Sequence, residues 1–139
     1  MQLLLICFFT LALSSFFNSK TDNYTPQTDP LKESITRGSE IYTDFCMNCH
    51  LPNGEGIENT FPPLAKSDYL MKNREKSIRG IKYGQSGEII VNGVTYNSTM
   101  VAPGLSDDEV ADVMNYITNS WGNKNENIVT EEEVSKIKK

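Results

Sequence analysis

The sequence is poor in metal-binding side chains, because its 139 residues include one histidine and three cysteines. A structural zinc site usually needs four such ligands, commonly supplied as two cysteine or histidine pairs. Cys7 lies in an N-terminal apolar segment that we expect to be removed, which leaves Cys46, Cys49 and His50. The sequence therefore argues against a zinc site, and it excludes a metal held by two histidines of this chain.

The sequence also lacks an excess of positive charge, with 13 lysines and arginines against 18 acidic residues and a net charge of -5. Nucleic-acid binding depends on a basic surface, so we exclude nucleic acid as a partner. The length suits one domain, and 38% of the residues are hydrophobic. No cluster of catalytic acids, bases or nucleophiles is recognisable, so we expect a protein that is not an enzyme.

No apolar stretch is long enough for a membrane-spanning helix of about 20 residues. Residues 3–17 are apolar except for one threonine and two serines, as in the apolar region of a secretory signal. We predict a signal peptide over residues 1–19, cleaved after residue 14 or nearer residue 19, and a flexible polar leader over residues 20–30. Export to the periplasm or another extracytoplasmic space would follow. The alternative is an uncleaved signal that anchors the protein in the membrane.

The segment Cys46-Met47-Asn48-Cys49-His50 has the pattern C-x-x-C-H, which is typical of covalent haem attachment. Two thiols three positions apart lie on neighbouring faces of one helical turn, where each can add to one vinyl group of a haem. The adjacent His50 can then supply an axial imidazole to the iron. A thioredoxin-like cysteine pair would need a βαβ context, and no buried parallel-strand run flanks this motif. We therefore predict one haem c, attached through Cys46 and Cys49.

Two prolines follow the motif in the segment Phe61-Pro62-Pro63-Leu64. A metal-ligating histidine usually donates its other ring N–H to a nearby acceptor, which orients the ring. We predict that the carbonyl group of Pro62 or of Pro63 accepts this bond from His50. The alternative is that the two prolines only form a rigid turn.

A methionine is the expected second axial ligand of the iron. Met100 lies in an irregular segment 50 residues beyond His50, from which it can fold over the opposite face of a haem. Met71, in a predicted short helix, is the alternative methionine, and an open or water-filled position is a third arrangement. Ligation by histidine and methionine raises the reduction potential and suits electron transfer.

Apolar periodicity predicts an all-α fold with one small exception. We expect helices from residue 31 into the C-x-x-C-H motif, in two short segments between 67 and 83, over 106–121, and over 130–139. The dipeptide Asn92-Gly93 between β-branched runs predicts a short hairpin over residues 88–97. Residues 66–82 carry six basic and two acidic side chains, which predicts either a solvated face or a charge distribution that orients docking.

Taken together, several segments resemble the bacterial class I monohaem cytochromes c, including the cytochrome domains found with nitrite reductases, quinoprotein dehydrogenases and oxidases. The segments that carry the resemblance are Gly38-x-x-x-Tyr42-x-x-x-Cys46-x-x-Cys49-His50, Phe61-Pro-Pro-Leu-Ala65, Asn92-Gly93, Met100, Leu105-Ser-Asp-Asp-Glu109 and Ser120-Trp121-Gly122-Asn123. The resemblance implies a cytochrome c fold over residues 31–139, with His50 and Met100 as proximal and distal ligands. It also implies that the first helix crosses the helix over 106–121, with Gly38 near Tyr116. One departure is Leu51, where the family often has glycine.

The expected function is that of an exported monohaem cytochrome c that carries single electrons between a donor and an acceptor protein, such as a reductase, a dehydrogenase or an oxidase. One alternative is a cytochrome c subunit held permanently in a larger redox enzyme complex. Another is a haem-based sensor or peroxidase with a displaceable Met100. The absence of a second histidine disfavours this last alternative, because no distal histidine base is available.

Overall fold

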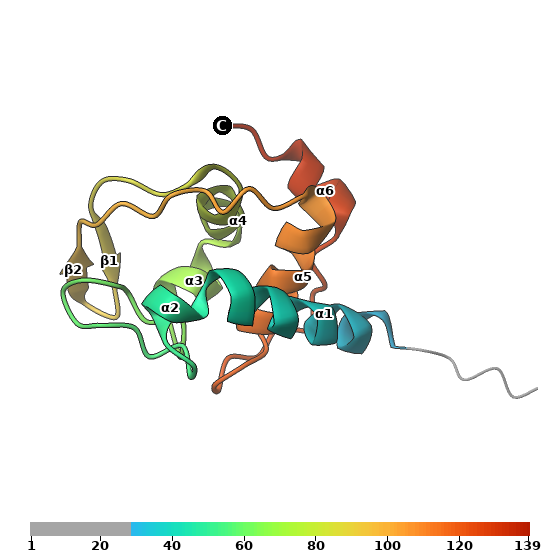
Figure 1. The fold of residues 1–139 in the computed structure, drawn as a ribbon, viewed down its shortest axis with the longest axis horizontal. Coiled ribbons are helices and arrows are strands. Elements are labelled where there is room, and N and C mark those ends of the chain that lie inside the picture. The colour runs from blue at the N-terminus through green and yellow to red at the C-terminus, as the bar shows by residue number, and fades with distance from the viewer. Residues whose placement is uncertain (1–28) are drawn as a thin grey trace, which may run out of the picture.

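A computed structural model describes residues 29–139 of the chain (Figure 1). The predicted signal peptide over 1–19, and the predicted leader up to residue 28, lie outside the described residues. The described part is mostly helical with one small antiparallel sheet, which confirms the predicted fold class. Its elements are α1 (Pro30–Phe45), α2 (Met47–His50), α3 (Asp68–Lys72), α4 (Arg74–Tyr83), β1 (Ile89–Val91), β2 (Val94–Tyr96), α5 (Asp107–Ile117) and α6 (Glu131–Lys136). Within residues 29–139, no helix combines the length and the apolar character needed to cross a membrane.

The first helix, α1, begins at Pro30, one residue earlier than the periodicity predicted. The Asp29 carboxylate caps it by accepting a hydrogen bond from the Leu31 N–H at 3.0 Å. Proline suits the first helical position because its missing N–H would have no partner there. The helix then runs directly toward the C-x-x-C-H motif, so its orientation determines where that motif lies.

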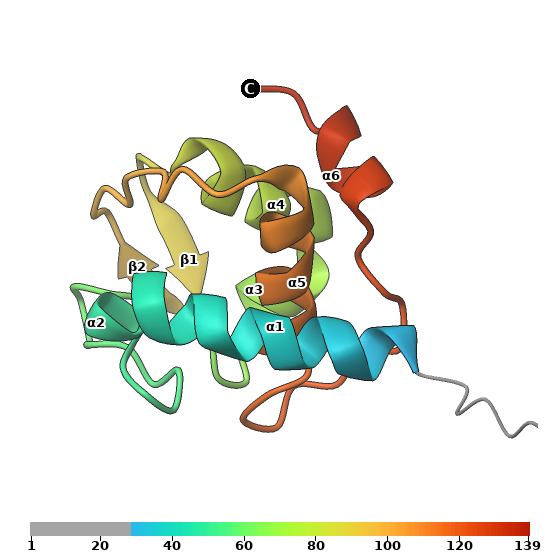
Figure 2. The ribbon, with the colours of Figure 1, turned by 45° about the vertical axis from the view of Figure 1, so that its right-hand side comes forward.

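Helix α1 crosses α5, and both views show the two helices in contact (Figures 1 and 2). Gly38 lies at the crossing point. A methyl group at this position would overlap the backbone carbonyl of Asp112 and lie 2.8 Å from the Cβ atom of Tyr116. This confirms the predicted proximity of Gly38 and Tyr116. Helix α5 also has an apolar face that is fully or almost fully buried. This face comprises Val110, Val113, Met114 and Ile117.

Helix α5 has the predicted start but ends earlier than predicted. The Ser106 N–H donates to the Glu109 carboxylate at 2.9 Å, as expected for a capping box. The predicted end at residue 121 is wrong, because the helix stops at Ile117. The Thr118 hydroxyl donates to a backbone carbonyl of the last helical turn, and Trp121 has a φ of 53°. The indole ring of Trp121 packs on the Tyr42 ring, at a centroid distance of 4.9 Å.

The predicted hairpin is present as β1 and β2, which pair antiparallel. Asn92 and Gly93 form its turn with φ values of 51° and 82°, the left-handed conformations that a two-residue hairpin turn requires. Asp68 ties this turn to the start of α3. Its N–H donates to the Asn92 side chain at 2.9 Å, and its carboxylate accepts from the Asn92 N–H at 2.7 Å. The hairpin is therefore anchored beside α3 rather than free.

Three of the basic side chains between residues 66 and 82 bind the C-terminal segment. Neither of the two interpretations of their charge, a solvated face or a distribution that orients docking, predicted these contacts. Arg74, Arg79 and Lys82 each donate to a backbone carbonyl in residues 127–139. Arg74 also pairs with both carboxylate oxygens of Glu133, at 2.6 and 2.7 Å. These bonds hold α6 against α4, so part of the positive charge has a structural role.

Candidate haem-binding site

The attachment motif forms a single tight turn directly after α1. The backbone N–H groups of Cys49 and His50 both donate to the Cys46 carbonyl, at 3.2 and 3.0 Å. Both cysteines are free thiols, and they line one cavity together with His50. Burial raises the pKa of the Cys46 thiol to about 11, and the neighbouring Cys49 contributes to this rise. The turn therefore presents two unpaired sulfur atoms and one imidazole to the same space.

The imidazole ring of His50 is held by a backbone carbonyl. Its Nδ1 atom lies 2.9 Å from the carbonyl oxygen of Pro62. A carbonyl oxygen can only accept, so the proton resides on Nδ1 and leaves Nε2 with a free lone pair. Of the two candidate prolines, Pro62 makes this contact, whereas Pro63 only lines the cavity. Burial lowers the pKa of His50, with a smaller opposing effect of the Pro62 contact, and this favours the neutral ring that can bind a metal.

The loop between His50 and Pro62 is itself anchored, which fixes the position of that carbonyl. The Gly56 N–H donates to the His50 carbonyl at 3.0 Å. Leu51, where the resemblance led us to expect glycine, has a φ of 63° and a ψ of 163°. This is a region of backbone space that is nearly specific to glycine, which accounts physically for that expectation. The Leu51 carbonyl accepts from the Tyr42 hydroxyl at 2.6 Å, and this bond holds the conformation in place.

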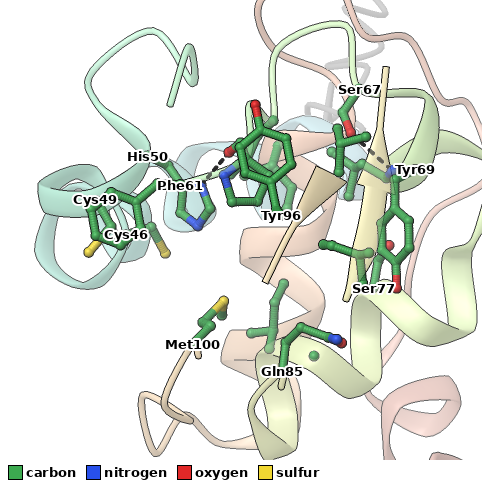
Figure 3. A pocket seen from close by; sticks show the side chains of 18 of the residues that line it. Cys46, Cys49, His50, Phe61, Ser67, Tyr69, Ser77, Gln85, Tyr96 and Met100 are labelled. Atoms are coloured by element: carbon green, nitrogen blue, oxygen red, sulfur yellow. Dashed lines mark hydrogen bonds between the residues drawn. The ribbon is translucent and has the colours of Figure 1, made fainter. Parts of the chain in front are cut away.

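Met100 enters the cavity from the side opposite His50, and its side chain points toward the imidazole ring (Figure 3). Its backbone makes two hydrogen bonds with that of Gln85, in which the N–H of each residue donates to the carbonyl of the other at 2.8 and 2.9 Å. Gly84 allows this close approach, because a Cβ atom at this position would lie 2.9 Å from the Met100 carbonyl oxygen. The segment that carries Met100 is therefore fixed to the end of α4.

Residues 29–139 contain four methionines, and among them Met100 alone lines this cavity. Met71 is 38% exposed and lies next to a different hollow. Met114 is fully buried on the apolar face of α5, and Met47 packs against the core. The structure thus brings together Cys46, Cys49, His50 and Met100 but leaves the alternative candidate Met71 outside.

The cavity has a volume of about 390 Å³ and a largely apolar wall contributed by the attachment turn, α3, α4, α5, the hairpin and the segment before α5. Gly80 lies in the middle of α4, where glycine costs about 1 kcal/mol relative to alanine. It lines the cavity, and a Cβ atom added at this position would have its nearest neighbour 3.8 Å away, on the Gln85 side chain. A glycine at this cost next to an open apolar space fits the close approach of a flat hydrophobic group. The residues present therefore fit a haem.

Some residues of this site were not identified from the sequence. These residues are Gly80, Gly84 and Gln85. A glycine inside a predicted helix is a signal that could have indicated Gly80. The pairing of Gln85 with Met100 joins segments 15 residues apart through backbone atoms, which leave no pattern in the side chains.

Comparisons with known proteins agree with this geometry. The profile of the cytochrome c family matches residues 35–121. A cytochrome c-552 of Thermus thermophilus is 40% identical over 110 residues, which cover 73% of this chain and 83% of that protein. The cytochrome c subunit of a quinone alcohol dehydrogenase of Gluconobacter oxydans is 30% identical over 105 residues, covering 73% of this chain and 22% of that subunit. The cytochrome c subunit of a gluconate 2-dehydrogenase of Pantoea cypripedii is 31% identical over 105 residues and matches over 24% of its length. The chain belongs to the cytochrome c family, and it carries one haem c bound covalently through Cys46 and Cys49.

Proposed function

We propose that this protein is an exported electron carrier whose haem iron is ligated by His50 and Met100. The observation that carries the proposal is the approach of these two side chains to one apolar cavity from opposite sides (Figure 3). The two residues bring an imidazole nitrogen and a thioether sulfur, the ligand pair typical of electron-transfer cytochromes c. Neither side chain needs a change of protonation state to bind iron at neutral pH.

The roles of the protein groups follow from this arrangement. When bound, the haem supplies reversible one-electron chemistry between ferric and ferrous iron. Pro62 holds the Nδ1 proton of His50, which fixes the tautomer and the ring orientation and increases the basicity of the ligand. Met100 offers a neutral, soft sulfur that favours the ferrous state, and the backbone bonds to Gln85 keep it in place. If His50 and Met100 both bind the iron, no position would be left for small molecules, which would suit electron transfer over chemistry on a bound substrate.

Export is supported by the sequence and by the chemistry of attachment. Residues 3–17 have the apolar character of a secretory signal. In bacteria, thioether attachment of haem takes place outside the cytoplasm, so a c-type haem and a signal segment in one chain are consistent. We infer a location in the periplasm or another extracytoplasmic space, with membrane attachment only if the signal is retained. We further infer that the partners are redox proteins, one that donates and one that accepts the electron.

A second candidate function is that of a subunit in a larger redox enzyme. Two of the similar proteins are cytochrome c subunits of dehydrogenases, and this supports such a role. This chain matches less than a quarter of the length of either subunit, whereas it matches 83% of the cytochrome c-552. Purification of the native protein separates the two, because a subunit elutes with its complex and a carrier elutes alone.

The experiment that tests the ligation is replacement of Met100 by alanine, followed by absorption spectra with and without carbon monoxide. The parent is expected to be low-spin, to bind carbon monoxide only very slowly, and to show the sulfur-to-iron charge-transfer band when oxidised. Met100→Ala should lose this band, bind carbon monoxide, and have a reduction potential lower by on the order of 0.1 V, within the range of about 0.8 V that axial ligands control. Met71→Ala is the matched control and should behave as the parent. A Met100→Ala protein with the spectrum and potential of the parent would contradict the assignment.

A further inference from the structure

The hydroxyl oxygen of Ser77 is buried and has no hydrogen-bond partner among residues 29–139, the one such side-chain atom in this part of the chain. Serine in a helix can satisfy its hydroxyl by donating to a carbonyl one turn earlier, as Ser39 on α1 does toward Thr36 at 2.7 Å. Ser77 lies inside α4 and makes no such bond. A buried polar atom without a partner is unfavourable, because it has lost its hydration and gained no hydrogen bond in return. The Ser77 hydroxyl therefore points to a partner that is not part of the protein chain.

Ser77 lines the haem cavity on the side away from the attachment cysteines. Figure 3 shows Cys46 and Cys49 at one end of the cavity and Ser77 with Tyr69 at the other. A haem has its two vinyl groups along one edge and its two propionate groups along the opposite edge. A haem attached through both cysteines would have its vinyl edge toward α2. Its propionate edge would then lie toward α3 and α4, the helices that carry Tyr69 and Ser77.

The charges around the cavity agree with an anion at this end. No aspartate or glutamate belongs to the described residues that line the cavity, and Lys76 is the one permanently charged side chain among them. Lys76 directly precedes Ser77 in α4. A carboxylate that enters a largely apolar cavity needs both a hydrogen-bond donor and a positive charge nearby to offset the loss of its hydration. Ser77 supplies the donor, and Lys76 supplies the charge.

We propose that Ser77 donates its hydroxyl proton to a haem propionate, with Lys76 as the nearby counter-charge. Ser77 is thus a positioning residue for the propionate edge of the haem. The inference requires the covalent haem but does not depend on ligation by Met100. The proposed hydrogen bond has a functional consequence, because it affects how the reduction of the haem iron is coupled to the protonation of the propionate. A propionate that loses its hydrogen bond holds its proton to higher pH, so the pH range over which the reduction potential falls is moved upward.

The test compares two variants of the haem-loaded protein that have nearly the same shape. Ser77→Thr keeps a hydroxyl, whereas Ser77→Val replaces it with a methyl group. The reduction potential is measured between about pH 4 and pH 10. One hydrogen bond to a charged group is worth about 1.5–3 kcal/mol, and one pKa unit corresponds to 1.36 kcal/mol. We expect the pH-dependent fall in potential to lie about one to two pH units higher in Ser77→Val than in the parent, and Ser77→Thr to follow the parent.

The controls separate this effect from changes in the helix or in the iron ligands. Ser39→Ala removes a helical hydroxyl outside the cavity and should leave the pH profile unchanged. Ser77→Ala repeats the comparison without added bulk, in case the valine is not accommodated. The redox-induced infrared difference spectrum gives a second readout, because a carboxylate stretch should shift in Ser77→Val and Ser77→Ala but not in Ser77→Thr.

Two results would overturn the proposal. One is a pH profile and carboxylate stretch in Ser77→Val and Ser77→Ala that match those of the parent. The other is an equal shift in Ser77→Thr and Ser77→Val, which would indicate an effect of size rather than of the hydroxyl. The carbon monoxide response of the same samples reports on Met100 independently. Failure of this inference is therefore distinguishable from failure of the proposed ligation.

Discussion

Replacement of Gly84 by alanine is expected to loosen the hold of the protein on Met100. Gly84 has a φ of 88°, so an alanine there carries a backbone strain of about 1–3 kcal/mol. The added methyl group would also lie 2.9 Å from the Met100 carbonyl oxygen and 3.2 Å from the backbone nitrogen of Ala102. Because both neighbours are backbone atoms, the contact can be relieved only if the segment that carries Met100 moves away from α4. Movement of that segment draws the thioether sulfur out of its position opposite His50.

The size of the effect can be worked out by comparison with Gly87. Gly87 has a similar φ of 84° but has no atom within 4 Å of an added methyl group. Gly87→Ala therefore carries a comparable strain without displacing the Met100 segment. Overpacking against a fixed neighbour costs about 1–3 kcal/mol. Since about 1.4 kcal/mol changes an equilibrium tenfold, the population with Met100 displaced should rise about tenfold in Gly84→Ala.

The assay is the rate at which the ferrous protein binds carbon monoxide, which is proportional to the population with an open axial position. We expect this rate to rise about tenfold in Gly84→Ala and to stay near the parent value in Gly87→Ala. Equal rates in the two variants would refute the reasoning, because they would mean that the contact between Gly84 and the Met100 segment does not hold the ligand in place.

Two further predictions concern stability. Gly38→Ala gains about 1 kcal/mol of helix propensity but places a methyl group on the Asp112 carbonyl, so we expect a net loss of about 2 kcal/mol in the free energy of unfolding by denaturant. Ser39→Ala, the adjacent control, should change it by less than about 0.5 kcal/mol, and a Gly38→Ala protein as stable as the parent would contradict the tight crossing. The Arg74 hydrogen bond lowers the pKa of Glu133 below its ordinary value of 4.5, so this pair stabilises the protein above that pH and loses its effect as the pH falls through the lowered pKa. We expect Glu133→Gln to be less stable than the parent by about 1 kcal/mol at pH 7, and we expect this difference to shrink as the pH falls below 4.5 through the lowered pKa of Glu133. A difference that is the same in acid as at pH 7 would exclude the carboxylate as its source.

The local features of the chain could be predicted from the sequence because each depends on neighbouring residues. The C-x-x-C-H motif needs one helical turn, and the structure places its three functional side chains in such a turn. The cap at Ser106 and the turn at Asn92-Gly93 follow from side-chain oxygens and left-handed backbone conformations within four residues. The end of α5 was predicted wrongly, because the aromatic contact between Trp121 and Tyr42 is made across the fold and outweighs the helical periodicity of the segment.

By itself, the sequence determined that the chain carries a haem attachment motif and that its fold is helical. For the acceptor of the His50 bond it left Pro62, Pro63 or a plain rigid turn, and for the second axial ligand it left Met100, Met71 or an open position. The tertiary structure alone decided that the Pro62 carbonyl meets His50, that Met100 shares its cavity while Met71 does not, and that the Ser77 hydroxyl is buried without a partner among residues 29–139. The physical reason is that these outcomes depend on distances between segments far apart in the chain. The type and spacing of residues limit the contacts that each side chain can make. The packing of α1, α4 and α5 determines which of these possible contacts are formed.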